Sequence, residues 1–281
     1  MELTSRPNEV TDITADQLRQ YIDAHSQTEY LIVDVRQPEE FEKGHLPGAK
    51  LIPVGTIVER MAELSRHANL IFCCGNGGER SQRAADLAAK NAGFKVFKLR
   101  GGLSAWHEDK VSGFANLKAI DLSGGIDKAL LSAMNLEKGA ERFYEALYAE
   151  LKNTVVGPLL NGLAGAEEGH AREIHDILTE MGAAPKEDFD DFYESLPGDL
   201  LESGETFDEV IQRAKDDKLG PVALLELALG MEFRAHDLYA ALADRQESAK
   251  LRRQLQELVD QEKKHGNDLL KGIGMLAEAL G

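Results

Sequence analysis

The hydrophobic and polar positions along the chain follow two different patterns, one in each half. Over residues 10–110, short apolar runs alternate with amphipathic stretches, whereas from residue 126 onward apolar positions recur with the period of a helix. Alternating strands and helices are typical of an α/β unit with a parallel sheet, and long helices in series are typical of a bundle. The sequence therefore predicts an α/β domain at residues 1–115 and an all-α domain at residues 116–281.

Short apolar runs bounded by turn-forming residues mark the expected strands of the first domain. Four runs are expected to be strands, at residues 30–34, 51–53, 69–73 and 95–99. The amphipathic stretches predict helices at residues 14–25, 57–64 and 80–91, and a last short helix near Trp106. Strands joined by helices in this order favour a parallel sheet.

The second domain contains four long helical segments, expected at residues 127–152, 154–181, 221–244 and 248–279. Residues 182–220, between the second and the third, are too many for a hairpin connection. The prolines and glycines of this stretch indicate a long crossover with a short helix at residues 207–215. Such a crossover within a four-helix bundle is typical of ferritin-like folds.

Glutamate and histidine recur at matched spacing on the long helical segments. Glu137 and Glu232 are each followed thirty residues later by a Glu-x-x-His pair. Residues three apart on a helix share one face, so each pair can direct a carboxylate and an imidazole at one point. The expected metal ligands are Glu137, Glu167, His170, Glu232, Glu262 and His265.

This ligand set favours a pair of iron ions, with manganese as the alternative. Imidazole together with carboxylate suits iron or manganese better than magnesium or calcium. A single Glu-x-x-His pair on an acidic helix is usually surface decoration, but two pairs in matched register with two further glutamates fit a di-metal bundle. The aromatic residues nearby, including Tyr144 and Tyr239, are expected to pack in the core, with at most one tyrosine beside the metals.

The segments Leu136–Tyr144 and Glu167–His170, with their second-half counterparts, resemble the rubrerythrin branch of the ferritin-like superfamily. The resemblance implies a non-haem di-iron centre that reacts with peroxide or dioxygen, and a homodimer formed through the helical domain. Rubrerythrins carry a further glutamate one turn after Glu232, where this chain has Ala235 followed by His236, which leaves peroxidase activity open. Because the sequence lacks the four cysteines of a rubredoxin module, electrons are expected to come from a separate donor protein.

Cys74 follows the expected strand at residues 69–73 and opens a glycine-rich turn that leads into a helix. Several backbone N–H groups of such a turn point inward and, together with the helix dipole, form an anion-binding nest. A thiol in a nest has a lowered pKa, so Cys74 is expected to be the nucleophile and Arg80 to hold an oxyanion. Cys73 fits a buried strand position. The expected anion-binding loop consists of Gly75, Asn76, Gly77, Gly78, Glu79 and Ser81.

Four segments around this loop resemble a rhodanese domain, namely Val33–Arg36, Glu39–Phe41, Gly44–Ala49 and Leu99–Trp106. The resemblance covers almost all of residues 10–110 and implies a sulfurtransferase. Thiosulfate or another sulfane donor would leave a persulfide on Cys74, and its terminal sulfur would pass to a thiol or cyanide. Asp34, Arg36 and His45 are expected to be structural anchors of the fold.

The cysteine loop is one residue longer than in most rhodaneses. Five residues separate Cys74 from Arg80, whereas rhodaneses usually have four. The longer loop resembles those of phosphatases and arsenate reductases, so an activity of that kind is the alternative for the first domain, although the sequence identifies no general acid. For the whole chain, the alternative is an iron-binding or storage protein with a non-catalytic rhodanese module for docking.

Charge and cysteine content indicate which classes of partner to exclude and in which cellular compartment to expect the protein. The net charge is -17, and residues 121–281 hold 33 Asp and Glu against 17 Lys and Arg. Such an acidic surface repels nucleic acid and anionic membranes, so neither is expected as a partner. The sequence shows neither a signal peptide nor an apolar stretch of roughly 18 residues that could cross a bilayer. The two adjacent cysteines are badly placed for a disulfide, so reduced thiols and a cytoplasmic location are expected.

Overall fold

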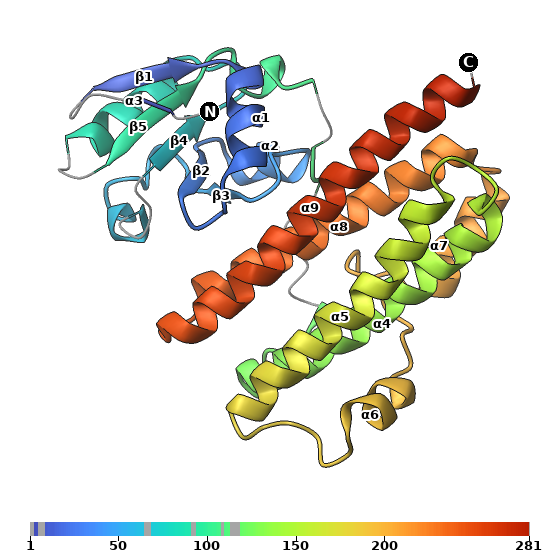
Figure 1. Ribbon diagram of the computed structural model, residues 1–281. Coiled ribbons are helices and arrows are strands. Elements are labelled where there is room, and N and C mark those ends of the chain that lie inside the picture. Colours follow the sequence, from blue (N-terminus) through green and yellow to red (C-terminus); the bar gives the residue numbers. More distant parts are fainter. Residues whose placement is uncertain are drawn as a thin grey trace. The chain divides into compact units, whose positions relative to one another are not determined.

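The computed structural model describes residues 3–4, 9–64, 69–90, 94–107, 110–112 and 119–280. The chain divides into two compact units, Met1–Phe114 and Ala115–Gly281 (Figure 1). Each unit has a hydrophobic core of its own. The expected junction near residue 115 lies outside the described residues.

The first unit is built on a parallel β-sheet, as the alternating pattern predicts. Within the described residues, five strands lie in the order β1-β5-β4-β2-β3, and every neighbouring pair is parallel. Central strands β2 and β4 are almost entirely buried, which explains their continuous apolar runs. Edge strand β1 was not predicted. Its short sequence Val-Thr-Asp-Ile is only partly buried and therefore lacks a continuous apolar run. The strands are β1 (Val10–Ile13), β2 (Tyr30–Asp34), β3 (Ala49–Leu51), β4 (Asn69–Cys73) and β5 (Lys95–Leu99).

The first helix of this unit begins at a local capping signal. Thr14 caps this helix by accepting a hydrogen bond from the backbone N–H of Gln17, whose side chain bonds back to the N–H of Thr14. The helix expected at residues 57–64 is wrong in its first half, because both the N–H and the hydroxyl of Thr56 donate to the carbonyl of Pro53 and turn the chain. The helices are α1 (Ala15–Ala24), α2 (Pro38–Glu42) and α3 (Glu79–Ala89), with 3-10 helices η1 (Met61–Leu64) and η2 (Gly102–Ala105).

The second unit contains the expected four-helix bundle, drawn in green to red in Figure 1. Helix α4 packs along α5 and α8 packs along α9, while α4 also contacts α8 and α5 contacts α9. Proline in the first turn of α5 and of α8 suits those helix starts, where the missing N–H has no partner to lose. The long helices are α4 (Ile126–Leu151), α5 (Gly157–Glu180), α8 (Pro221–Asp244) and α9 (Ala249–Leu280).

The crossover between α5 and α8 contains α7 (Phe207–Asp216), which matches the predicted short helix, and also α6 (Phe189–Ser195). Helix α6 starts at Asp188, whose side chain accepts a hydrogen bond from a backbone N–H of the first turn. Between α6 and α7 the chain makes a tight turn, closed by an antiparallel bridge between Leu200 and Thr206. Within the described residues, every helix is too short or too polar to span a membrane.

Candidate metal centre and cysteine loop

The middle of the four-helix bundle holds a cluster of acidic and imidazole side chains. Each long helix contributes to it, and all members of the cluster are buried, with exposed fractions between 1% and 8%. The two residues of each Glu-x-x-His pair lie on one helix face, as their spacing predicts. The members are Glu137 from α4, Glu167 and His170 from α5, Glu232 from α8, and Glu262 and His265 from α9.

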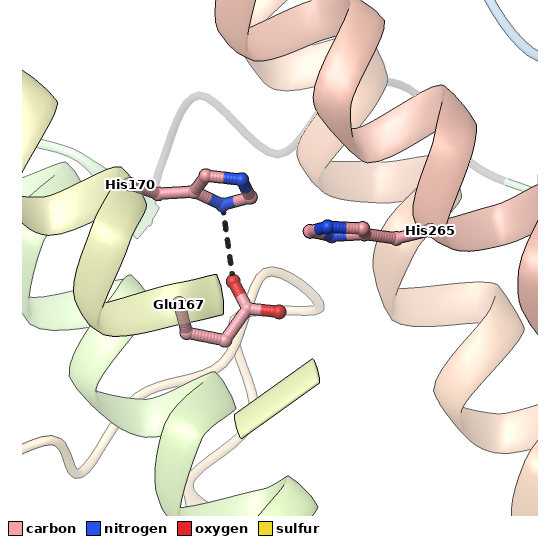
Figure 2. A group of neighbouring side chains, drawn as sticks. All are labelled: Glu167, His170 and His265. Carbon is pink, nitrogen blue, oxygen red and sulfur yellow. Dashed lines mark ion pairs between the residues drawn. The ribbon is translucent and has the colours of Figure 1, made fainter. Parts of the chain in front are cut away.

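The imidazole of His170 lies among three carboxylates from three helices. Its Nδ1 is 3.4 Å from Oε2 of Glu137, 3.2 Å from Oε2 of Glu167 and 3.1 Å from Oε1 of Glu262. The ring of His265 lies 5.0 Å from that of His170, centroid to centroid, and Figure 2 shows both pointing inward with Glu167 between α5 and α9.

Glu262 connects the two halves of the cluster. One of its oxygens lies near His170, and the other lies 3.8 Å from Nδ1 of His265, which is also 3.5 Å from Oε2 of Glu232. Among the described residues, three sets of side chains offer ligand atoms within 4.8 Å of one another. These sets are Glu137, Glu167, His170 and Glu262; Glu232, Glu262 and His265; and Glu167, His170 and His265. Glu167 and Glu262 each belong to two sets and can therefore face two ions.

The buried atoms of this cluster fit a pair of cations better than they fit one another. Both ring nitrogens of His170, Nδ1 of His265, Oε2 of Glu232 and Oε1 of Glu262 lack a hydrogen-bond partner in the structure. Several of them lie within ion-pair distance of one another without forming hydrogen bonds, and their ligand atoms gather within 4.8 Å. Because buried polar atoms are rarely left unpaired, this arrangement is that of ligands converging on metal ions.

Burial and crowding shift the pKa values of Glu167, Glu232 and Glu262. Burial, reinforced by neighbouring carboxylates, raises the pKa of Glu232 to about 8 and that of Glu167 well above its usual range. Burial also opposes the ionisation of Glu262, but the two imidazoles at its oxygens outweigh it and hold its pKa well below the usual range. Burial disfavours the charged form of His265, yet Glu232 and Glu262 raise its pKa to about 9. Without cations the cluster therefore retains protons, and bound metal ions would displace them.

Two tyrosine hydroxyls orient the glutamates that stand alone on their helices. The hydroxyl of Tyr144 on α4 donates to Oε1 of Glu232 on α8, and that of Tyr239 on α8 donates to Oε1 of Glu137 on α4. The expectation of at most one tyrosine beside the metals is therefore wrong. The signal was present in the sequence, since each tyrosine follows a glutamate by seven residues, two helical turns along the same face.

The structure also brings in a carboxylate that the sequence analysis missed. Glu202, on the turn between α6 and α7, is 5% exposed, and its Oε2 has no hydrogen-bond partner. Nothing in the spacing of the crossover singles it out. At the position one turn after Glu232, Ala235 packs in the apolar core, and the ring of His236 faces its neighbour Asp237 at 3.3 Å.

Cys74 lies at the carboxyl end of β4 with its sulfur among hydrogen-bond donors. Its Sγ is 3.3 Å from Oγ of Ser81, and backbone N–H groups of Asn76, Gly78 and Ser81 also face it. Burial raises the pKa of Cys74, but these donors outweigh burial and lower the pKa overall. The pKa of Cys73, on the opposite face of the strand, is raised well above its usual range by burial and by Asp34.

The loop around Cys74 is held by the segment that follows β5. The N–H of Leu103 donates to the carbonyl of Cys74, and that of Ser104 donates to the carbonyl of Gly75, both at 2.9 Å. Gly77 has a φ of +66°, and a Cβ there would lie 2.7 Å from the carbonyl oxygen of Leu99. The loop thus needs glycine at this position and is rigidly supported from behind.

Arg80, the expected oxyanion holder, is paired with a carboxylate from α2. Its Nη1 and Nη2 lie 2.5 and 3.0 Å from the carboxylate oxygens of Glu40, and Arg80 holds the pKa of Glu40 at about 2. The guanidinium still lies over the loop, 3.7 Å from the place a Cβ on Gly75 would occupy. Glu79, at the start of α3, is exposed.

The expected anchors of this unit make structural contacts. Arg36 donates to both oxygens of Asp34 and, at 2.7 Å, to the carbonyl of Gly44. His45 lies with Nδ1 3.1 Å from the carbonyl oxygen of Phe41, against whose ring it stacks. These contacts join the end of β2 to the segment after α2.

Named relatives exist for parts of the chain. The sulfurtransferase of Allochromatium vinosum is 36% identical over 27% of this chain and 70% of its own length, and the putative sulfurtransferase YtwF of Bacillus subtilis is 33% identical over 35% and 91%. The uncharacterized protein YqhL of Bacillus subtilis is 37% identical, and the chain spans 59% of its length. The chain spans about half, 51%, of the putative sulfur carrier protein YrkF. A rhodanese-like domain protein from Staphylococcus aureus is 31% identical, with a TM-score of 0.32 over 35% of this chain and 92% of that one.

Family models cover both units. The model of the rhodanese-like domain matches residues 14–109, and the rubrerythrin model matches residues 128–273, which is more than half of the chain. The first match contains strands β2 to β5 and the cysteine loop. The second overlaps all four long helices and contains the six clustered side chains. The chain therefore belongs to the rubrerythrin family and carries a rhodanese-like domain ahead of its four-helix bundle.

Proposed function

We propose that the chain is a sulfur and redox enzyme in which each unit has its own chemistry. The rhodanese-like unit would act as a sulfurtransferase at Cys74, and the bundle would act as a di-iron oxidoreductase on peroxide or dioxygen. Sulfurtransferase names among the relatives support the first half, and the rubrerythrin match supports the second.

The observation that carries the sulfurtransferase proposal is the ring of donors around the sulfur of Cys74. A lowered pKa supplies thiolate near neutral pH, and inward N–H groups stabilise negative charge on a bound or transferred sulfur. The thiolate attacks the outer sulfur of thiosulfate, a sulfur–sulfur bond forms at Cys74, and sulfite leaves with the electron pair of the broken bond. A thiol or cyanide then takes the terminal sulfur and regenerates the thiolate.

Intact-mass analysis after exposure to thiosulfate tests this half. The wild-type protein and Cys73→Ser are expected to gain one sulfur atom, which a later addition of cyanide removes, whereas Cys74→Ser gains none. Cys73→Ser is the matched control because its thiol is adjacent in sequence but has a pKa raised by burial, whereas that of Cys74 is lowered. An adduct that persists in Cys74→Ser would refute the assignment of the nucleophile.

A second candidate for this unit is hydrolysis of a phosphate or reduction of an arsenate, and the length of the loop favours it. Five residues between Cys74 and Arg80 enclose a wider nest, which suits a tetrahedral oxyanion. If the protein hydrolyses an aryl phosphate, loses this activity in Cys74→Ser and forms no sulfur adduct, the first unit is a phosphatase and not a sulfurtransferase.

The observation that carries the redox proposal is the buried cluster of four carboxylates and two imidazoles. Glu137, Glu167, His170 and Glu262 would hold one iron ion, and Glu232, Glu262 and His265 the other, with Glu167 within reach of both. When bound, a pair of iron ions supplies electrons for the reduction of peroxide or dioxygen. Tyr144 and Tyr239 fix the orientation of Glu232 and Glu137, and the surrounding apolar core restricts access of water.

Rapid mixing of the anaerobic ferrous protein with peroxide or dioxygen tests this half. Repeated turnover in the presence of a chemical reductant is expected of an oxidoreductase, whereas a single oxidation without further turnover would support iron storage instead. Glu262→Gln and His170→Ala should each lower the amount of bound iron. Manganese loading in parallel determines which metal supports turnover.

We further propose that a separate protein supplies the electrons and that the helical unit forms a homodimer. The electron donor is inferred because two adjacent cysteines cannot build the four-cysteine site of a rubredoxin. Reduction of the oxidised protein by an added iron–sulfur protein tests the donor, and light scattering after size exclusion tests the dimer. A monomer at micromolar concentration would contradict the second proposal.

A further inference from the structure

The turn between α6 and α7 is anchored to α4 by several independent contacts. The N–H of Gly198 donates to Oδ1 of Asn135 at 2.9 Å, and Nη1 of Arg142 donates to the carbonyls of Gly198 and Pro197 at 2.6 and 3.0 Å. The guanidinium of Arg142 also lies 4.4 Å from the ring centroid of Phe207. Both ends of the turn are therefore fixed against the helix that carries Glu137.

The turn approaches α4 closely next to Glu137. A Cβ on Gly139 would lie 2.1 Å from the carbonyl oxygen of Leu200 and 3.4 Å from the side chain of Leu201, so this approach requires glycine. Leu201 is fully buried, and its N–H donates to the carbonyl of Glu205 at 3.0 Å, which closes the turn around the residues between them. The backbone thus holds Leu200 and Leu201, the two residues before Glu202, against α4 at Gly139, two residues from Glu137.

Glu202 is buried in a way that an isolated carboxylate does not tolerate. Its exposed fraction is 5%, its Oε2 has no partner, and no ion pair to it exists among the described residues. Glu205, three residues later on the same turn, is the contrast, because it is partly exposed and forms an ion pair with Arg213. A buried carboxylate with an unpaired oxygen is costly, so the pocket around Glu202 favours a positive charge or a proton.

The charges that act most strongly on Glu202 are those of the metal cluster. Burial raises the pKa of Glu202 well above its usual range, and the negative charges of Glu137, Glu262 and Glu232 raise it further. Glu202 in turn adds to the high pKa of Tyr239, the residue that donates to Glu137. The carboxylate therefore lies on the Glu137 side of the cluster.

We propose that Glu202 is a seventh metal-site side chain, which rotates inward and binds the ion held by Glu137 when the metal pair is loaded. Among the described residues it is not part of the three converging sets, so binding requires a change in its side-chain torsions while the anchored backbone stays in place. Its ligand is a divalent or trivalent transition-metal ion. The inference rests on the proposed metal pair and extends it with a ligand from outside the four long helices.

Anaerobic titration of the metal-free full-length protein with Co²⁺ tests this inference, because visible absorption of Co²⁺ reports its ligand set. The variants are Glu202→Gln and the matched control Glu205→Gln, which removes a carboxylate from the same turn. Glu202→Gln is expected to bind one of the two ions about 10- to 100-fold more weakly, with a changed absorption band. Glu205→Gln is expected to match the wild type in both respects.

Thermal unfolding of the same proteins separates a ligand from a structural residue. As a ligand, Glu202 should contribute to the rise in melting temperature on Co²⁺ addition, so Glu202→Gln shows a smaller rise and an unchanged or higher melting temperature without metal. A lower melting temperature without metal, together with wild-type Co²⁺ affinity and absorption, would assign Glu202 a purely structural role and overturn the inference.

Two results keep this inference separate from the proposed metal pair itself. If the wild type fails to bind two Co²⁺ ions, both the metal-pair proposal and the role of Glu202 are refuted. If the wild type binds two ions and Glu202→Gln binds them identically, only the role of Glu202 is refuted. Should Glu202→Gln not fold, Glu202→Asp keeps the charge and shortens the reach by one methylene. In the same titration, we expect Glu202→Asp to bind one ion more weakly than the wild type, and unchanged binding would refute the inference.

Discussion

The hydroxyl of Tyr239 on α8 donates a hydrogen bond to the carboxylate of Glu137 on α4, across 102 residues of sequence. Tyr144 on α4 makes the reciprocal bond to Glu232 on α8. The two bonds brace the pair of helices that contribute one carboxylate each to the cluster. Each bond leaves the second oxygen of its glutamate directed at the histidine side, where a metal ion would bind.

Tyr239→Phe and Tyr144→Phe should destabilise the protein by similar amounts, because the two bonds are equivalent by position. Removal of the donor leaves a buried carboxyl oxygen without its partner, which is expected to lower the free energy of unfolding by about 1–3 kcal/mol. Urea unfolding of the metal-free protein measures the change. Tyr148→Phe, on the same helix as Tyr144 but only half-buried, is the control, and an equal loss there would contradict the assignment.

The pKa of the Cys74 thiol should lie below its ordinary value of about 9. Thiolate absorbance in the ultraviolet, measured as a difference between wild type and Cys74→Ser, should therefore rise at lower pH than for a free thiol. Ser81→Ala should shift this curve towards higher pH, because the hydroxyl of Ser81 stabilises the thiolate. An unshifted curve in Ser81→Ala would contradict this role.

The lowered pKa of Cys74 also determines whether the free energy of unfolding rises or falls with pH. Between the lowered pKa of folded Cys74 and its ordinary value, the unfolded chain holds a proton that the folded chain has lost. The contribution of Cys74 to the free energy of unfolding therefore increases with pH across this window and is absent below it. Chemical unfolding at several pH values should show this increase in the wild type relative to Cys74→Ser.

Glu40→Gln should strengthen the binding of oxyanions at the cysteine loop. In the structure, the charge of Arg80 is shared with Glu40, whose pKa of about 2 keeps the pair ionised at neutral pH. Because both side chains are more than one third exposed, the gain is limited to about 1 kcal/mol, roughly fivefold in affinity. Calorimetric titration with thiosulfate measures this affinity in a Cys74→Ser background, where no sulfur is transferred, and exposed Glu39→Gln is the control. Weaker binding by Glu40→Gln would show that Glu40 positions Arg80 productively.

Gly139→Ala should destabilise the helical unit, because the added methyl group would overlap the carbonyl oxygen of Leu200. Overpacking of this kind costs about 1–3 kcal/mol. Gly165→Ala is the control, since a Cβ there meets nothing within 4 Å and alanine favours the helix. Thermal unfolding compares the two, and equal stability of both variants would show that the turn moves aside freely.

Many of the helices and strands could be predicted from local patterns of apolar and polar residues. The apolar runs at residues 30–34, 69–73 and 95–99 match β2, β4 and β5, and the four long helices lie within three residues of their expected ends. Periodicity is a local property, and a stretch that buries one face reveals its period without reference to the rest of the chain. The local patterns do not predict β1, α2 and α6, place β3 two residues too late, and wrongly extend a helix over residues 57–60. At residues 57–60 and at α6, single side-chain bonds of Thr56 and Asp188 set the local structure.

The six members of the metal cluster could be predicted because helix geometry converts spacing into direction. Glu167 and His170 share a face whatever packs against them, and the thirty-residue repeat places Glu137 and Glu232 in equivalent positions. Only the tertiary structure decided which partners those residues have. The pairing of Tyr239 with Glu137 and the burial of Glu202 beside the cluster depend on how distant segments pack, and no local period encodes such contacts.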